Sequence, residues 1–156
     1  MKGIEELREM AQKEAKRKYP NVPERALVIT KYKTTSANGL TKAIIDFLRL
    51  KGWQAERISN MGRVIDNRKT YTNVIGQLKT IGSAKYIPSS GTNGTADISA
   101  TIQGRSVKIE VKIGKDKQSL NQINYQRQIE ASGGVYFIAK NFEQSYKWYQ
   151  EIFEQL

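Results

Sequence analysis

The chain contains two runs in which apolar and polar residues alternate without a break, separated by a single Gln-Gly pair. In the first run, residues 96–102, the even-numbered positions are apolar, and in the second, residues 106–113, the odd-numbered positions are. Strict alternation is typical of strands that bury one face. Gln103 and Gly104 provide a two-residue turn, because glycine readily takes the positive φ that a primed turn requires. The pattern therefore predicts a β-hairpin with one apolar and one polar face.

A two-residue turn also determines which residues face each other across the hairpin. In that register Ile102 faces Arg105, and Asp97 faces Glu110 on the polar side. Directly opposed residues hold their Cβ atoms about 4.5 to 5.5 Å apart, and like charges at that distance are destabilising. A three-residue loop would change the register, so the opposition of the two carboxylates depends on the turn.

Two groups can compensate the repulsion between these carboxylates. Lys112 lies on the same polar side, two residues beyond Glu110, and can form a salt bridge. A Mg²⁺ ion would compensate the repulsion more fully, since Mg²⁺ is bound through one or two carboxylates plus waters and substrate phosphates. Lys112 would then orient or deprotonate an attacking water. A plain amphipathic hairpin with a surface Lys-Glu-Lys stripe explains the same pattern without catalysis.

The amino-acid composition narrows the chemistry that is open to such a site. The chain has 26 Lys and Arg against 15 Asp and Glu, a net charge of +11, and this balance favours a polyanionic partner. It has no cysteine and no histidine, which excludes disulfides, zinc knuckles, cysteine nucleophiles, Ser-His pairs and histidine-dependent nucleases. Carboxylates and lysines must therefore perform any catalysis.

The chain shows no sign of a membrane segment or of export. It has no run of 18 apolar residues, and no signal peptide opens it. We therefore expect a cytoplasmic protein of a bacterium or a phage-infected host cell. Its length of 156 residues fits one domain, in which 1–20 is an N-terminal helix, 36–140 is the core with a basic insertion at 60–94, and 141–156 is a C-terminal helix.

Helices and further strands are predicted on both sides of the hairpin. The predicted helices are residues 3–19, a helix that Ser36 or Asn38 caps and that ends before Gly52, a helix from the Ser-x-x-Gln capping box at Ser119 to Gly133, and residues 142–156. Residues 53–59 and a buried run at 135–140 are predicted strands, and residues 26–32 are a short strand or an extended linker. The aromatic stripe of 142–156 is interpreted as core. The order predicts an α/β fold with a mixed sheet flanked by helices.

Residues 60–94 have no clear periodicity but a pronounced charge bias. Between Arg57 and Thr95 there are six basic residues and a single acid, Asp66, together with two tyrosines. Such a segment suits contact with phosphates and bases, although a solvated loop would have the same composition. With two lysines in and after the hairpin, the candidate nucleic-acid contacts are Arg57, Arg63, Arg68, Lys69, Lys79, Lys85, Lys108 and Lys115.

Residues 94–140 resemble the core of the PD-(D/E)XK nucleases, and most of all their VRR-NUC branch, which occurs in phages and repair enzymes. The likeness consists of a Gly-Thr-x-Asp before a strand, a Glu-Val-Lys after a tight turn, a Leu and a Gln at the start of a helix, and a Gly-Gly before the last strand. It covers about a third of the chain. The residues that carry it are Gly94, Thr95, Asp97, Glu110, Val111, Lys112, Leu120, Gln122, Gly133 and Gly134.

The resemblance implies a restriction-endonuclease-like core that hydrolyses DNA with Mg²⁺, for which Mn²⁺ can substitute. Asp97 and Glu110 would hold the ion together with the Val111 carbonyl, Lys112 would stand at the water, and Gln122 near the scissile phosphate. The capping box explains Gln122 equally well. Likeness to Holliday-junction resolvases implies selectivity for branched DNA and a homodimer, whose two-fold symmetry would serve two strands.

The chain departs from the family pattern at two positions. Ala96 replaces a proline that shapes the entry to the strand. More consequentially, no acidic residue stands at 36–38, where such nucleases carry one at the start of the first core helix. Asn38 offers a neutral oxygen instead, or Glu56 or Asp46 supplies the carboxylate. The gap supports an alternative, a DNA-binding module with a degenerate nuclease core. An RNA-binding or ribosome-associated protein is a third interpretation, which rests on charge alone.

Overall fold

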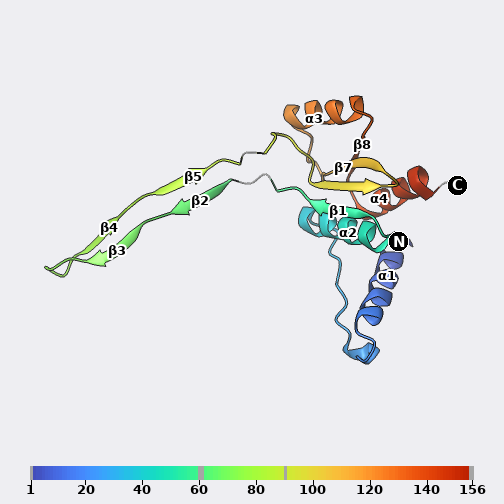
Figure 1. The fold of residues 1–156 in the computed structure, drawn as a ribbon, viewed down its shortest axis with the longest axis horizontal. Helices are drawn as coiled ribbons and strands as arrows, with labels where there is room; N and C mark the ends of the chain where they lie inside the picture. Colours follow the sequence, from blue (N-terminus) through green and yellow to red (C-terminus); the bar gives the residue numbers. More distant parts are fainter. Residues whose placement is uncertain (1, 60–61, 90, 155–156) are drawn as a thin grey trace. The chain divides into compact units, whose positions relative to one another are not determined.

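The computed structural model describes residues 2–59, 62–89 and 91–154. The chain divides into two compact units. The first, here called the core unit, comprises Met1–Ile58 and Gly94–Leu156, and the second, here called the arm, comprises Ser59–Asn93 (Figure 1). The arm coincides with the basic segment that has no periodicity in the sequence.

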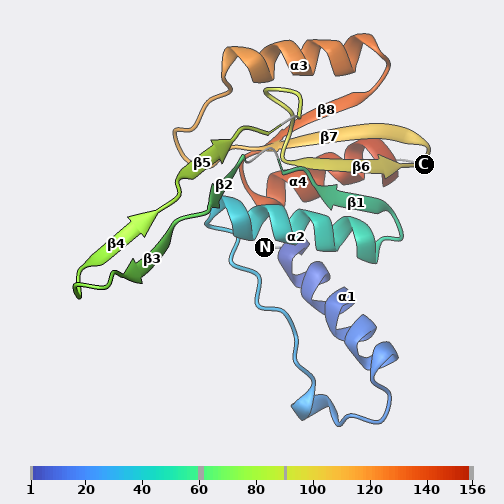
Figure 2. The same ribbon diagram turned by 60° about the vertical axis from the view of Figure 1, so that its left-hand side comes forward.

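A four-stranded sheet forms the centre of the core unit. Its strands are β1 (Gln54–Arg57), β6 (Ile98–Ile102), β7 (Arg105–Val111) and β8 (Val135–Ala139), in the order β1-β6-β7-β8. The first two pairings are antiparallel, and the β7–β8 pairing is parallel. One helix, α3 (Leu120–Ala131), lies on one side of the sheet, and α2 (Ala37–Leu50) and α4 (Phe142–Tyr149) lie on the other (Figure 2). The predicted mixed sheet flanked by helices is therefore confirmed.

The helices begin and end close to the predicted residues. Their bounds are α1 Lys2–Lys18, α2 Ala37–Leu50, α3 Leu120–Ala131 and α4 Phe142–Tyr149, which continues as a π-helical turn over Gln150–Glu154. Ser36, rather than Asn38, caps α2 by accepting the Gly39 N–H. The capping box at Ser119 is formed as the sequence predicts. Among the described residues, none of the helices combines the length and apolar character that a membrane span needs.

The central hairpin has the predicted turn and register. Gln103 and Gly104 both have positive φ, 49° and 76°, as a type I′ turn requires. Ile102 pairs with Arg105 and Ile98 with Ile109. The apolar side is buried, and Ile98 and Ile109 are each at most 1% exposed. The turn and the hydrophobic alternation therefore place Asp97 opposite Glu110.

The apolar helix faces and the apolar side of the hairpin form one core. The stripe of α2 is buried, with Leu40 fully covered, and the aromatic stripe of α4 packs around Phe47. Phe153, in the π-helical turn, belongs to the same cluster, whereas Leu156 lies outside the described residues. The interpretation of the C-terminal stripe as core is confirmed.

One expectation from the sequence is wrong in detail, and one alternative that the sequence left open is decided. The strand at 135–140 is not fully buried: only Ala139 of β8 is, because β8 is an edge strand with a single neighbour. Residues 26–32 form no strand. A short 3-10 helix, Glu24–Ala26, precedes an irregular segment that reaches α2, which corresponds to the extended linker that the sequence left open.

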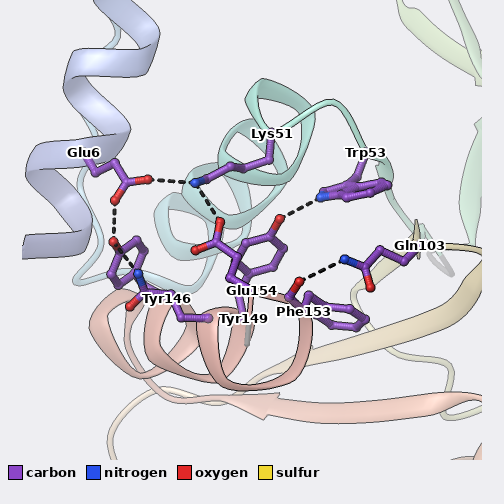
Figure 3. Close-up of polar contacts among 9 residues, drawn as sticks. Glu6, Lys51, Trp53, Gln103, Tyr146, Tyr149, Phe153 and Glu154 are labelled. Carbon is purple, nitrogen blue, oxygen red and sulfur yellow. Dashed lines mark hydrogen bonds and ion pairs between the residues drawn. The ribbon is translucent and has the colours of Figure 1, made fainter. Parts of the chain in front are cut away.

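A polar cluster ties the N-terminal helix to the rest of the core unit. The Lys51 Nζ lies 2.8 Å from Glu6 Oε1 and 2.8 Å from Glu154 Oε1, and the Tyr146 hydroxyl donates to the other Glu6 oxygen (Figure 3). Nearby, the Trp53 ring N–H donates to the Tyr149 hydroxyl over 2.7 Å. Three helices are thus joined by charged side chains at the rim of the core.

The Glu6 contacts predict a loss of stability in acid. Burial raises the pKa of Glu6, but hydrogen bonds from Lys51 and Tyr146 outweigh burial and lower it below its ordinary value of 4.5. A lowered pKa stabilises the fold above the unfolded-state pKa, and that contribution is lost as the pH falls through the folded-state pKa. We expect Glu6→Gln to lose less stability than the wild type between about pH 5 and 3.

Urea unfolding followed by tryptophan fluorescence measures this difference, because Trp53 and Trp148 both pack against the core. Glu9→Gln, at an exposed position of the same helix, is the matched control and should follow the wild-type pH profile. Identical profiles for Glu6→Gln and the wild type would contradict the role assigned to Glu6.

The arm is an antiparallel ribbon made of two chain segments. The first segment contains β2 (Arg63–Asp66) and β3 (Lys69–Thr72), and the second contains β4 (Leu78–Ile81) and β5 (Ala84–Ile87). β2 pairs with β5, and β3 pairs with β4. Residues 73–77 close the ribbon, where the Asn73 N–H donates to the Gln77 carbonyl over 2.8 Å. Figure 1 shows the two strand pairs following one another along the ribbon.

Candidate active site

Asp97 is fixed where three strands of the core sheet end. It directly precedes β6, and its backbone carbonyl accepts the N–H of Ile58, just after β1, over 2.8 Å. Its side-chain Oδ2 accepts the Val111 N–H of β7 over 2.9 Å. The strand ends therefore hold both the backbone and the carboxylate of Asp97.

Glu110 is the most deeply buried charged residue of the core sheet. It lies on the polar side of β7, is 2% exposed, and its Oε1 lies 3.0 Å from the Lys112 ammonium. Its other oxygen, Oε2, is buried and has no hydrogen-bond partner among the residues that the structure describes. Burial raises the pKa of Glu110, the contact with Lys112 lowers it, and the nearby charge of Asp97 raises it again, so that it lies above its ordinary value.

Gln122 forms the capping box that the sequence predicts, and its side chain also contacts Glu110. Its side-chain oxygen accepts the Ser119 N–H over 2.9 Å and completes the capping box of α3. Its side-chain nitrogen donates to Glu110 Oε1 over 2.5 Å. One carboxamide thus couples the first turn of α3 to the buried glutamate, which makes Gln122 a positioning residue for Glu110.

Lys112 lies between two carboxylates. Its Nζ is 3.0 Å from Glu110 and 3.5 Å from Asp116, and its side chain is 10% exposed. Burial lowers the pKa of Lys112, but Glu110 and Asp116 outweigh burial and raise it above the ordinary value. In this arrangement Lys112 is an ammonium group, suited to orienting an oxygen atom and unsuited to removing a proton.

The residues that would hold a divalent cation are Asp97, Glu110 and the carbonyl of Val111. Because the N–H and C=O of a strand residue point to the same edge, the Val111 carbonyl shares the edge at which its N–H meets Asp97. The orphaned Glu110 Oε2 is the kind of ligand that a hard cation takes. Among the residues described, no three acidic, histidine or cysteine side chains converge to hold a metal. Water and phosphate oxygens would complete the shell, as is usual for Mg²⁺.

The sequence offers Asn38, Asp46 or Glu56 in place of the missing helix carboxylate. Each of them has other neighbours, and among the residues described no third acidic side chain joins Asp97 and Glu110. Asn38, in the first turn of α2, accepts a hydrogen bond from Arg57 over 2.8 Å. Asp46 is hydrogen-bonded to Tyr32 and lines a cavity between α1 and α2. Glu56 is exposed and pairs with Ser99, two residues along β6 from Asp97.

The predicted basic contacts lie in four places. Lys108 is on the same side of β7 as Glu110, and its Nζ donates to Ser99 Oγ over 2.6 Å. Lys115 is exposed in the loop after β7, whereas Arg57 reaches Asn38 at the start of α2. The other five candidates belong to the arm, and they are Arg63, Arg68, Lys69, Lys79 and Lys85.

Two residues that the sequence interpretation missed belong to this site. Asp116 holds Lys112 from the loop after β7, four residues further along the chain. Tyr136, on β8, has its pKa raised by burial and by the charges of Glu110 and Asp97. The parallel β7–β8 pairing brings Tyr136 opposite Lys108, and no local pattern reveals a parallel register.

Comparison of the chain with protein-family models and with curated protein sequences gives no match.

Proposed function

We propose that this protein is a Mg²⁺-dependent endonuclease with a restriction-endonuclease-like core that hydrolyses phosphodiester bonds in branched DNA. The observation that carries the proposal is the buried Glu110, whose Oε2 has no partner among the described residues while Asp97 stands beside it. A buried carboxylate with an unsatisfied oxygen and a like charge nearby is costly for the fold. Such a cost is typical of functional sites, and a divalent cation would remove it.

The protein residues of the site have distinct tasks in the proposed reaction. A Mg²⁺ ion held by Asp97, Glu110 and the Val111 carbonyl would supply Lewis-acid stabilisation of the phosphate charge. The Lys112 ammonium donates hydrogen bonds to the attacking water or to a phosphate oxygen. Asp116 and Glu110 position that ammonium, and Gln122 positions Glu110.

The choice of DNA as substrate rests on the charge of the chain and on its resemblance to PD-(D/E)XK nucleases. A net charge of +11 suits a polyanion. Selectivity for branched DNA and action as a homodimer follow from the likeness to junction resolvases, in which two-fold symmetry presents paired sites to two strands.

Cleavage of a panel of four-way, flapped, nicked and linear DNAs tests the proposal. We expect the wild type to cut branched DNA in Mg²⁺ or Mn²⁺ and not in EDTA. Lys112→Ala should cut at least about 100-fold more slowly, the usual cost of removing one hydrogen-bond donor that stabilises transition-state charge. Lys147→Ala, at an exposed position of α4, is the matched control. If the wild type cuts none of these DNAs with either metal, the proposal is wrong.

The second candidate is a DNA-binding protein of the same fold without catalysis. The observation in its favour is the Arg57–Asn38 hydrogen bond, which stands where a carboxylate is expected at the start of α2. It predicts DNA binding that is unaffected by Mg²⁺ and by Asp97→Ala, with no strand cut under any metal condition.

A further inference from the structure

The two strand pairs of the arm share one continuous register. Arg63 pairs with Ile87 at one end and Thr72 with Leu78 at the other, and both strands advance by the same number of residues between these pairs. The Asn67 N–H donates to the Ser83 carbonyl over 3.1 Å, which continues the ladder between the two pairs. Neither strand contains an extra residue, so side chains alternate between two faces within each strand pair, and Gly82, with a φ of +91°, lies between the pairs.

This alternation separates the charges of the arm. The odd-numbered face carries Arg63, Lys69, Lys79 and Lys85, all exposed and without an acidic partner among the residues that the structure describes. The one acid of the arm, Asp66, lies on the even-numbered face, where Arg68 pairs with it over 2.7 Å. A hydrogen bond between the Thr70 and Thr80 hydroxyls lies on that face too. We call the odd-numbered face the basic face.

The basic face also exposes groups that can pack against sugars and bases. Tyr71 lies directly opposite Lys79 and is 48% exposed, and Ile81 lies opposite Lys69 and is 56% exposed. In each strand pair two cations without an acidic partner among the described residues would repel each other on a bare ribbon, and a two-stranded ribbon alone is marginally stable in water. A polyanion that binds this face relieves the repulsion and adds contacts to the ribbon.

We infer that the basic face of the arm binds the phosphate backbone of duplex DNA, with the ribbon lying along a groove. The inference rests on the proposed function for the choice of DNA over RNA. A two-stranded ribbon fits the major groove of B-DNA, which is about 12 Å wide. From Arg63 to Thr72 the ribbon spans roughly 30 Å at about 3.3 Å per residue, close to one helical turn of DNA. Arg68 belongs to the opposite face and does not take part.

A variant that moves charge between the faces tests this inference. The variant K69T/T72K/K79T/T80K keeps the composition and the net charge of the chain, and all four positions are exposed. Its new lysines stand in the same diagonal relation as the original pair, but on the even-numbered face. The comparison variant, K69T/K79T, removes the two charges.

The measurement is fluorescence anisotropy of a labelled DNA duplex in EDTA, titrated at several salt concentrations. Each phosphate contact contributes about 0.9 to the slope of log Kd against log salt, so both variants should lose about 1.8 in slope. If the wild type and the variants have equal affinities near 1 M salt, this loss of slope weakens the binding of the variants roughly 60-fold at 0.1 M salt. Circular dichroism and tryptophan fluorescence check that the variants fold.

The outcomes separate this inference from the proposed function. Binding of the face-exchange variant that equals wild-type binding would show that net charge alone matters and would overturn the inference. Tighter wild-type binding to duplex RNA than to duplex DNA at the same salt would overturn it as well. The assay contains no metal and cuts no strand, so a wild type that never cleaves DNA would refute the nuclease and leave the arm result intact.

Discussion

Replacing Glu110 by glutamine is expected to slow DNA cleavage severely and to abolish metal binding while leaving the fold intact. The substitution keeps the shape of the side chain and an oxygen that can accept from Gln122 and Lys112, but it removes the charge that a cation needs. Loss of about 4 kcal/mol of Lewis-acid stabilisation corresponds to about a 10³-fold lower rate. Single-turnover cleavage in Mg²⁺ measures this loss.

Thermal unfolding provides a second readout of the same variant. At 100 times the Kd a bound ion stabilises the native state by about 2.7 kcal/mol, which raises the Tm of a chain of this size by roughly 5–10 °C. We expect Mg²⁺ or Mn²⁺ to raise the Tm of the wild type and of the control Glu56→Gln, an exposed glutamate on β1. Glu110→Gln should show no shift. A wild-type Tm that neither metal changes would contradict the metal site.

The hairpin was predictable because its pattern leaves a single register. A shift by one residue would place Asp97 and Glu110 in the core and the isoleucines in water, so the alternation and the two-residue turn agree on one pairing. The buried isoleucines and the contact between Asp97 and the Val111 N–H follow from that register. The caps at Ser36 and Ser119 are equally local signals.

The arm could not be assigned from the sequence because neither of its faces is buried against a core. Without a core, apolar residues need not alternate with polar ones: Val64 and Tyr86 are more than half exposed on one face and Ile81 on the other. What alternates is charge, and this becomes visible only when the register of the ribbon is known. Long-range contacts such as Arg57 with Asn38 escape sequence reasoning for the same reason, because no local spacing encodes them.

Replacing Gly94 by alanine is expected to damage both the fold and the site. Gly94 has a φ of +80°, and a Cβ there would lie 2.4 Å from the Asn121 carbonyl carbon and 2.7 Å from the Gln122 nitrogen. These are backbone atoms of the first turn of α3, which cannot move without displacing Gln122 from Glu110. Strain from the positive φ costs about 1 kcal/mol and overpacking about 1–3 kcal/mol more. Metal-induced stabilisation should shrink as well.

Gly104→Ala is the matched control for this prediction. Gly104 has nearly the same φ, +76°, but a Cβ there meets nothing within 4 Å, so only the backbone strain remains. Urea unfolding followed by the fluorescence of Trp53 and Trp148 should show Gly94→Ala destabilised by about 2 kcal/mol more than Gly104→Ala. Equal losses of stability in the two variants would mean that the first turn of α3 does not pack on Gly94. The anchoring of Gln122 to Glu110 would then need another explanation.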